Sequence, residues 1–335
     1  APAKPSAARF RATNGGYDGA MRAAVAATGL ILMLAGCVVP QPPVIGPVAP
    51  QARPASPEVT APVAPVRSAL SRDIGDYYAR VETTMLRQGL LRTDPGGADA
   101  PFNERQLSEN FIRIALFEEY DSSGGRIVAR QTASRLHRWD GPIRMEVTFG
   151  ATVDPAQASL DRRAITRYSA RLGSLTGVSI SQVENGGNFN VFVVNEEERR
   201  ALGPRLQQLI PGISASAVRT VTDLPRSSYC LVFAYDPQND GTYERAVAVV
   251  RAEHPNLLRL SCFHEELAQA MGLSNDSPGA RPSIFNDDEE FALLTGHDEM
   301  LLRMLYDPRL KPGMTADVAA PIVTQIAAEM LGGNS

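Results

Sequence analysis

The sequence lacks a basic stripe, a long apolar run beyond its N-terminal part, and the common nucleotide-binding and esterase motifs. Its net charge is −4, so we expect no nucleic-acid partner, because such a partner is normally held by clustered Lys and Arg. No P-loop, dinucleotide fingerprint or GxSxG elbow is present. The chain has 335 residues, of which 44% are hydrophobic and 21% charged. That balance is typical of a soluble globular protein with one large or two small domains.

The one long apolar run lies near the N-terminus and resembles a bacterial lipoprotein leader. Arg22 precedes the apolar segment Ala23–Ala35, which is too short to span a membrane. The segment runs into Leu34-Ala35-Gly36-Cys37. This pattern resembles the lipobox, which implies that Cys37 is acylated and becomes the first residue of the mature chain. An ordinary signal peptide and a short buried helix are the alternatives.

Residues 1–36 are therefore expected to be a leader, with 1–20 as an upstream extension. The residue after Cys37 is valine rather than aspartate, as in lipoproteins that are sorted to the outer membrane. Residues 37–68 contain nine prolines and almost no large apolar side chain, so we expect an extended tether there rather than a core. At about 3.1 Å per residue, the tether reaches at most about 95 Å from the lipid.

Two cysteines remain once Cys37 carries the lipid. In an oxidising periplasm, Cys230 and Cys262 are expected to form one disulfide. The bridge closes a loop of about 30 residues, which stabilises the fold by about 3 kcal/mol in the chain-entropy model. Two buried thiols are the alternative.

Periodicity predicts a mixed α+β domain over 69–335, with a helical preface at 69–120 that forms part of it or a separate lobe. The strands gather before residue 255, so we expect a sheet with helices packed on one side. The predicted helices are 71–91, 104–120, 155–172, 196–209 and 255–271. The predicted strands are 126–139, 143–150, 178–183 and 188–195 (around an Asn-Gly-Gly turn), 229–235 and 245–253.

The stretch Cys262–Asp276, which reads CFHEELAQAMGLSND, has the spacing of a zinc-hydrolase helix but not its histidines. Such a helix places two metal ligands at i and i+4 on one face. A glutamate next to the first ligand polarises the metal-bound water. A glycine then ends the helix, and the chain turns back with a third ligand. Aligned on Gly272, the three ligand positions are held by Glu265, Gln269 and Asn275.

In this register Glu266 takes the place of the general base, and Asp276 is the acidic residue that follows the third ligand. A register that starts from His264 is rejected, because it places Ala268 at the second ligand and moves the glycine by one residue. Helical spacing puts Glu265, Glu266 and Gln269 on one polar arc, expected to face a cleft. The opposite stripe is apolar, and His264 lies beside it, so we expect His264 to be a hydrogen-bonded packing residue.

The residues after the motif extend the pattern. Ser283-Ile284-Phe285 stands where a metzincin has a methionine-containing turn, with Ile284 in place of the methionine. The segment 294–307 matches the form L-x-x-x-D-x-x-x-[IL]-x-x-LY of the closing helix. Residues 229–310 thus resemble a degenerate metzincin, which implies a zincin-like mixed sheet, a long motif helix and a closing C-terminal helix. The same stretch, with the lipobox, is similar to a bacterial lipoprotein family of unknown function, DUF2927.

The substitutions at the ligand positions change the expected chemistry. Zinc is held by imidazole, thiolate or carboxylate, so of the three positions only Glu265 offers a strong ligand. The amide oxygens of Gln269 and Asn275 suit harder cations better. We therefore expect no cofactor and a metal-free scaffold. Zinc or calcium at these positions, and a hydrolase with Glu266 as base, stay as alternatives.

The sequence thus predicts a lipid-anchored periplasmic protein that binds a peptide or envelope protein along an edge strand, taken to be 245–253. The alternative function is a metallopeptidase-like hydrolase with non-standard ligands. The acidic run 286–290 is interpreted as a solvated loop or helix N-terminus. Among the remaining histidines, His297 is the best candidate for an additional cleft residue.

Overall fold

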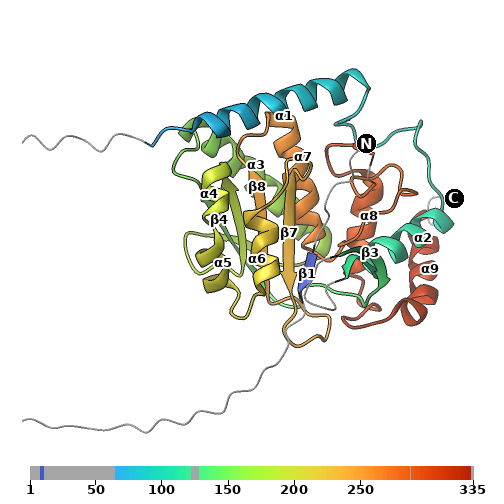
Figure 1. The fold of residues 1–335 in the computed structure, drawn as a ribbon. Helices are drawn as coiled ribbons and strands as arrows, with labels where there is room; N and C mark the ends of the chain where they lie inside the picture. Colours follow the sequence, from blue (N-terminus) through green and yellow to red (C-terminus); the bar gives the residue numbers. More distant parts are fainter. Residues whose placement is uncertain (1–7, 11–64, 122–127, 287, 333–335) are drawn as a thin grey trace, which may run out of the picture. The chain divides into compact units, whose positions relative to one another are not determined.

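A computed structural model of the chain describes residues 8–10, 65–121, 128–286 and 288–332. The lipobox, Cys37 and most of the proline-rich segment lie outside this part. The described helices are α1 Ala69–Arg87, α2 Glu104–Ala115, α3 Pro155–Thr176, α4 Glu196–Arg200, α5 Gly203–Leu209, α6 Ala215–Thr222, α7 Asn256–Gln269, α8 Gly296–Leu305 and α9 Ala316–Gly332. The strands are β1 Ala8–Phe10, β2 Phe117–Asp121, β3 Val128–Ala133, β4 Ile143–Phe149, β5 Ile180–Val183, β6 Phe189–Val194, β7 Cys230–Tyr235 and β8 Arg245–Arg251 (Figure 1).

The main sheet has the strand order β1-β7-β8-β6-β4-β5. Strands β4, β5, β6 and β8 run parallel to one another, and β7 is antiparallel to β8. The short β1 pairs in parallel with β7, while β2 and β3 form a separate antiparallel pair. The prediction of a mixed α+β fold is confirmed in this form.

The prediction that 245–253 is an edge strand is wrong, because β8 lies between β6 and β7. Every residue of β8 after Arg245 is buried, as is typical of a strand covered on both faces. In the described part the outer strands are β1 and β5, and β7 lies between β8 and the short β1.

Helices cover both faces of the sheet rather than one. Side chains of one face, such as Val191 and Ala248, belong to a core cluster with Phe263 of α7 and Leu172 of α3. Alternate residues of the same strands pack in a second cluster with α5 and α6. The one-sided prediction is therefore wrong: the apolar runs of β6, β7 and β8 place large side chains on both faces, and both must be buried.

The two strands around the Asn-Gly-Gly turn do not pair with each other. Both β5 and β6 pair in parallel with β4, which lies between them. The connecting segment lies close against β4, since a Cβ added at Gly187 would come 2.6 Å from Cβ of Glu146. Glycine is needed there because another backbone approaches so closely.

The N-terminal helices differ in part from their prediction. The helix expected over 104–120 ends at Ala115, and β2 follows it. Its start is fixed by a capping box, in which Asn103 and Gln106 satisfy each other's backbone N–H groups. Tyr78 of α1 and Phe111 of α2 are fully buried in the same apolar cluster as the sheet. The helical preface thus shares the core of residues 128–332.

The disulfide prediction is confirmed. Cys230, the first residue of β7, is bonded to Cys262 of α7, with an S–S distance of 2.05 Å. The bridge ties β7 to the motif helix. None of the helices in the described ranges is long and apolar enough to cross a membrane.

Candidate functional site

The motif helix α7 follows β8 directly and is held at its N-terminal end by α1. The backbone N–H of Leu258 donates to Oε2 of Glu82, at 2.8 Å, which satisfies one of the free donors of a helix start. His264 is a packing residue, as expected. Its Nδ1 accepts from the N–H of Leu294 at 3.0 Å, and its ring stacks on Tyr168 with centroids 4.0 Å apart. Burial lowers the pKa of His264 to about 3, so the ring is neutral.

Two aromatic side chains donate hydrogen bonds to the C-terminal end of α7. The indole N–H of Trp139 donates to the carbonyl of Ala270 at 2.9 Å. The hydroxyl of Tyr306 donates to the carbonyl of Met271 at 3.0 Å. Gly272 then turns the chain with φ +123°, and a Cβ there would lie 2.0 Å from the carbonyl oxygen of His137. The glycine of the motif is therefore required by both backbone conformation and space.

The five polar residues of the motif are buried, so the polar arc does not face open solvent. Exposed fractions are 3% for Glu265, 1% for Glu266, 1% for Gln269, 2% for Asn275 and 7% for Asp276. A general base must reach a substrate within hydrogen-bond distance. At 1% exposure, the carboxylate of Glu266 does not meet this requirement in the described conformation.

The two amide side chains at ligand positions have other contacts. Nδ2 of Asn275 donates to the carbonyl of Arg113 at 2.8 Å, which fixes the loop after α7 to the end of α2. Nε2 of Gln269 lies 3.5 Å from Oδ1 of Asp276, at the limit of a hydrogen bond. Oε1 of Gln269 is buried with no hydrogen-bond partner in the described ranges.

These residues do not fit a catalytic zinc. Such a site needs three strong ligands around one point, and no group of three or more His, Cys, Asp or Glu side chains with metal-binding geometry occurs in the described part of the chain. The hydrogen bond from Nδ2 of Asn275 to the carbonyl of Arg113 fixes the orientation of that amide, and its neutral oxygen is a weak zinc ligand. One buried amide oxygen, that of Gln269, does not make up for the missing ligands.

The turn at Ser283-Ile284-Phe285, expected to stand in place of a methionine turn, is tied to α8. Both carboxylate oxygens of Asp298 accept hydrogen bonds from it: Oδ1 from the Ser283 hydroxyl at 2.5 Å, and Oδ2 from the Ile284 N–H at 3.1 Å. Asp298 also accepts from the N–H and the hydroxyl of Thr295, each at 2.9 Å. His297 next to it is fully buried, with Nε2 3.1 Å from Nδ2 of Asn110. The interpretation of His297 as a cleft residue is therefore wrong.

The acidic run contributes to surface ion pairs. Glu290 pairs with Arg92 at 3.0 Å and with Arg281 at 2.6 Å, and Asp287 lies outside the described residues. These two guanidinium groups lower the pKa of Glu290. The run therefore helps to hold the segment before α8 against the residues after α1.

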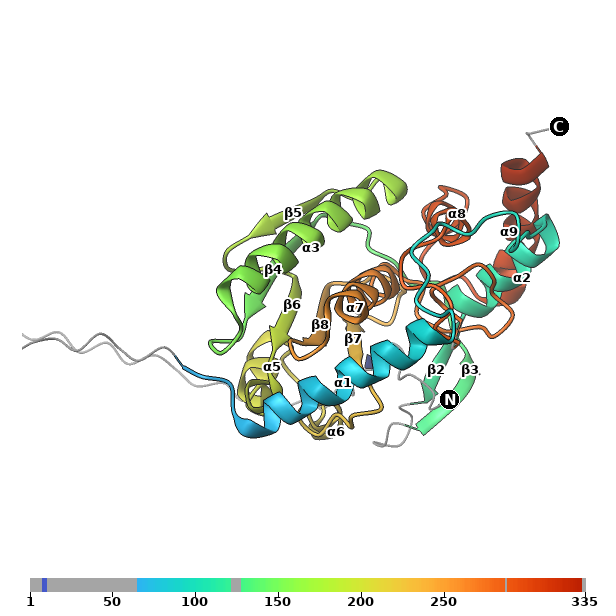
Figure 2. The ribbon, with the colours of Figure 1, turned by 90° about the horizontal axis from the view of Figure 1, so that it is seen from above.

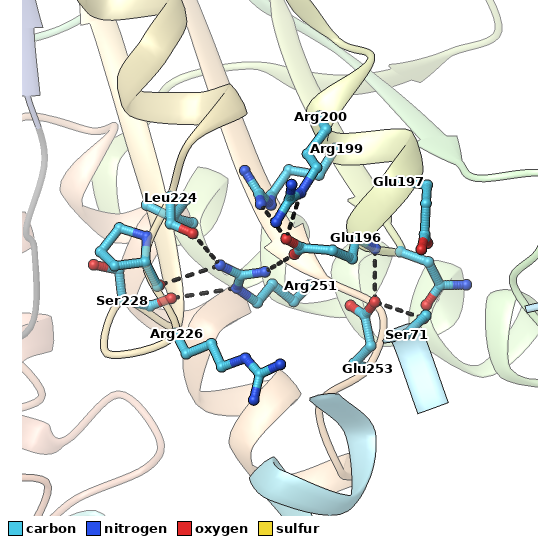
Figure 3. A network of polar contacts seen from close by, with 12 residues as sticks. Ser71, Glu196, Glu197, Arg199, Arg200, Leu224, Arg226, Ser228, Arg251 and Glu253 are labelled. Carbon is cyan, nitrogen blue, oxygen red and sulfur yellow. Dashed lines mark hydrogen bonds and ion pairs between the residues drawn. The ribbon is translucent and has the colours of Figure 1, made fainter. Parts of the chain in front are cut away.

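A second polar cluster lies where β6 and β8 end, and sequence reasoning missed it (Figure 3). Its central side chains, Glu196, Arg199 and Arg251, are at most 3% exposed. Glu196 pairs with Arg251 at 2.5 Å and with Arg199 at 2.8 Å. The remaining N–H groups of Arg251 donate to the carbonyls of Leu224, Pro225 and Ser228.

The carboxyl groups of this cluster are shifted in opposite directions. Burial alone raises the pKa of Glu196, but hydrogen bonds from Arg199 and Arg200 outweigh it and hold that pKa at about 2. Burial raises the pKa of Glu253. Its Oε1 accepts from the Ser71 hydroxyl at 2.7 Å and from the Glu196 N–H at 2.6 Å. The signal in the sequence was a pair of charged residues, Arg251 and Glu253, at the end of an apolar strand.

Comparison with known proteins yields one family. The family model described as "Protein of unknown function (DUF2927)" matches residues 104–325. A search of the curated proteins found no match to this chain. The matched stretch takes in α2, the whole of β4 to α8, and most of α9. Since the match spans more than half of its length, the chain belongs to the DUF2927 family.

Proposed function

We propose that this protein is a lipid-anchored component of the bacterial periplasm, attached to the outer membrane. Its zincin-like domain binds an extended segment of a peptide or envelope protein. The anchor rests on the lipobox that ends in Cys37 and on the proline-rich segment after it. The Cys230–Cys262 disulfide supports an oxidising compartment.

Several elements support the zincin-like part of the proposal. A mixed sheet leads directly into the motif helix α7, and Gly272 reverses the chain behind it. The turn at Ile284 and the closing helix α8 follow in the order that the resemblance implies, joined by Asp298. These elements persist although the zinc histidines are absent.

The burial and the hydrogen bonds of the motif residues favour binding over hydrolysis as the function. Glu266 is 1% exposed, and the Asn275 amide holds the end of α2. The motif end of α7 therefore behaves as part of the core, and the surface that meets a ligand has to lie elsewhere on the sheet.

The observation that carries the proposal is the pairing of β1 with the outer edge of β7. Ala8, Arg9 and Phe10 align with Phe233, Ala234 and Tyr235 in parallel register. An edge strand offers a row of unpaired backbone N–H and C=O groups, and this edge accepts a segment from far away in the sequence.

Removal of the leader would break the pairing of β1 with β7. If Cys37 is the first residue of the mature chain, Ala8–Phe10 is removed with the leader. The edge of β7 is then open to another extended segment. Backbone hydrogen bonds supply affinity in such strand addition, and side-chain pockets supply selectivity.

Hydrogen exchange of β7 tests the proposal. The full chain would carry Cys37→Ala, which prevents acylation and the processing that depends on it. Adding Arg9→Pro removes a backbone N–H and disrupts β1. The outer-edge amides of β7 should then exchange faster, and a synthetic peptide with the sequence of residues 4–14 should restore their protection.

The matched control is Ala12→Pro, two residues beyond β1, which should leave β7 protected. If β7 exchanges at the same rate with and without Arg9→Pro, or if added peptide restores no protection, the edge is not a strand acceptor. The expectation that the domain holds no metal is tested by the metal content of the same preparation, measured after incubation with zinc and calcium and then desalting. Near-stoichiometric zinc would overturn it.

A further inference from the structure

The solvent-facing side of α3 carries charge of one sign. Its four partly or fully exposed charged residues are all arginines: Arg162, Arg163, Arg167 and Arg171. The one acid in the helix, Asp161, is 4% exposed and forms a buried ion pair with Arg259 of α7 at 2.9 Å. By contrast, α1 mixes Arg80 and Arg87 with Asp76 and Glu82.

Two of these arginines form no ion pair with another described residue. Arg163 donates to the Ser159 hydroxyl at 2.6 Å, and neither Arg163 nor Arg167 has an ion pair within the described ranges. Arg92 and Arg309, which are only partly exposed, each meet at least two carboxylates. Exposed Arg80 and Arg87 of α1 also lack an ion pair in the described part of the chain, but they share their helix with Asp76 and Glu82. The positive charge on α3 is therefore available to a partner.

An apolar side chain stands at the N-terminal end of this face. Leu160 is 55% exposed, and the spacing i, i+3, i+7 places Leu160, Arg163 and Arg167 on one side of the helix. A basic helix face that also presents leucine is typical of helices that lie on an anionic lipid surface. The outer face of a helix is convex, which suits a plane rather than a groove.

We propose that the face of α3 formed by Leu160, Arg163 and Arg167 docks the domain onto an anionic phospholipid surface. The arginines contact lipid phosphates, and Leu160 enters the headgroup region. This contact rests on the proposed function only in that a tethered domain stays close to the bilayer. The proposed tether keeps the domain close to the bilayer, and α3 sets the orientation of the domain on it.

The position of α3 in the fold determines how the rest of the domain is oriented when this helix lies on the bilayer. Figure 2 shows α3 alongside β4 and β5, at one margin of the sheet. Strand β7 lies toward the other margin, next to the short β1, and is separated from β4 by β8 and β6. With α3 on the bilayer, the strand-accepting edge of β7 faces away from the lipid, toward partners in the periplasm.

An acidic peptide fits this face less well. A hollow of about 420 Å³ lies between α3 and β5 and is lined by Val147, Arg162, Thr166, Gln182, Val183 and Glu184. Arg162 is engaged there with the Val147 carbonyl and lies over the Phe149 ring. Glu184 places a carboxylate in the same hollow, which would repel an acidic segment.

Vesicle co-sedimentation tests the proposal on the full chain carrying Cys37→Ala, so that no acyl chain contributes. The vesicles contain equal parts of phosphatidylglycerol and phosphatidylcholine, or phosphatidylcholine alone. We expect salt-sensitive binding to the anionic vesicles only. Arg163→Glu with Arg167→Glu should weaken binding at least about tenfold, and Leu160→Ser about threefold.

Arg80→Glu with Arg87→Glu on α1 is the matched control, because it makes the same charge change on a helix of mixed charge. It should alter binding less than about twofold. Equal losses in the two variants would show a net-charge effect and overturn the assignment to α3. Absence of vesicle binding would overturn it as well. The assignment would also be overturned if the protein bound a polyglutamate peptide instead of vesicles and lost that binding in the variant with Arg163→Glu and Arg167→Glu. None of these outcomes bears on the exchange of β7.

Discussion

Two buried polar clusters lie near opposite ends of the motif helix, and they are built differently. The sheet-end cluster, formed by Glu196, Arg199, Arg251 and Glu253, joins opposite charges at 2.5–2.8 Å. The motif cluster consists of Glu265, Glu266, Gln269, Asn275 and Asp276. There, Gln269 reaches its neighbour only at 3.5 Å and leaves one oxygen without a partner in the described part of the chain.

The difference separates side chains held by short ion pairs from the Gln269 amide, which has one long contact. A buried charge is tolerated when ion pairs and hydrogen bonds satisfy it, and removing one partner then destabilises the protein strongly. A buried amide with a poor contact stabilises little and can be replaced by an apolar side chain. Removing a side chain from each cluster should therefore have unequal effects.

The largest effect is expected for Arg251→Met. The change leaves the carbonyls of Leu224, Pro225 and Ser228 without their donor and removes one partner of Glu196. Loss of such a buried partner lowers the free energy of unfolding by about 3–5 kcal/mol. Urea unfolding measures it.

The matched change in the motif cluster is Gln269→Leu, which removes the unpartnered oxygen and keeps the side-chain size. It should change the free energy of unfolding by less than about 1.5 kcal/mol. Equal losses in the two variants would contradict the distinction between the clusters.

The next effect depends on pH. The pKa of Glu196 is held at about 2, below its ordinary 4.5, so its ionisation stabilises the fold above pH 4.5. That stability is lost as the pH falls toward 2. Glu196→Gln should therefore cost about 3 kcal/mol at neutral pH and progressively less below pH 4.5. Urea midpoints measured between pH 2 and pH 7 follow the trend.

Glu253→Gln should show the opposite trend, because burial raises the pKa of Glu253 and makes its ionisation unfavourable in the fold. The variant should gain stability relative to the natural chain as the pH rises above the ordinary value for glutamate. Parallel pH profiles for the two variants would mean that the assignment of the opposite shifts is wrong.

The last effect comes from building a metal site into the motif cluster. In the combined variant Glu265→His, Gln269→His and Asn275→His, the apoprotein should be less stable because the positions are buried. Zinc should be taken up in one equivalent and restore about 2.7 kcal/mol at a hundredfold excess over the dissociation constant. Metal content by mass spectrometry and thermal unfolding measure the two quantities.

A shifted variant sharpens the test. Ala268→His creates a second histidine four residues after His264, in the register rejected above. It should bind no zinc, because the ring of His264 is committed to Leu294 and Tyr168. Zinc uptake by the shifted variant alone would show that the alignment on Gly272 is wrong.

The motif segment could be predicted closely because local spacing determines it. Helix α7 was expected over 255–271 and spans Asn256–Gln269, and the closing helix was expected within 294–307 and spans Gly296–Leu305. Gly272 and the packing role of His264 follow from the same short-range pattern. The disulfide was predictable because two cysteines remained once Cys37 was assigned to the lipid.

Features that depend on distant contacts could not be read in the same way. The strand order places β8 at the centre, although its sequence looks like that of any apolar strand. The residues of β2 continue the helical pattern of α2, and pairing with β3 decides their conformation. The burial of Glu265, Glu266 and Gln269 depends on what packs over the polar arc, which helical spacing does not reveal.

The attachment of α1 has a mechanical consequence. The helix begins directly after the proline-rich segment, and its first turns are bonded to the ends of the sheet through Ser71 and Glu253, at 2.7 Å, and through Asp73 and Arg226, at 3.2 Å. The contact of Glu82 with α7 comes later along the same helix. If the chain is anchored at Cys37 as proposed, a pulling force on the segment before α1 reaches the sheet before it reaches the motif helix, so α1 shields the motif helix from that force.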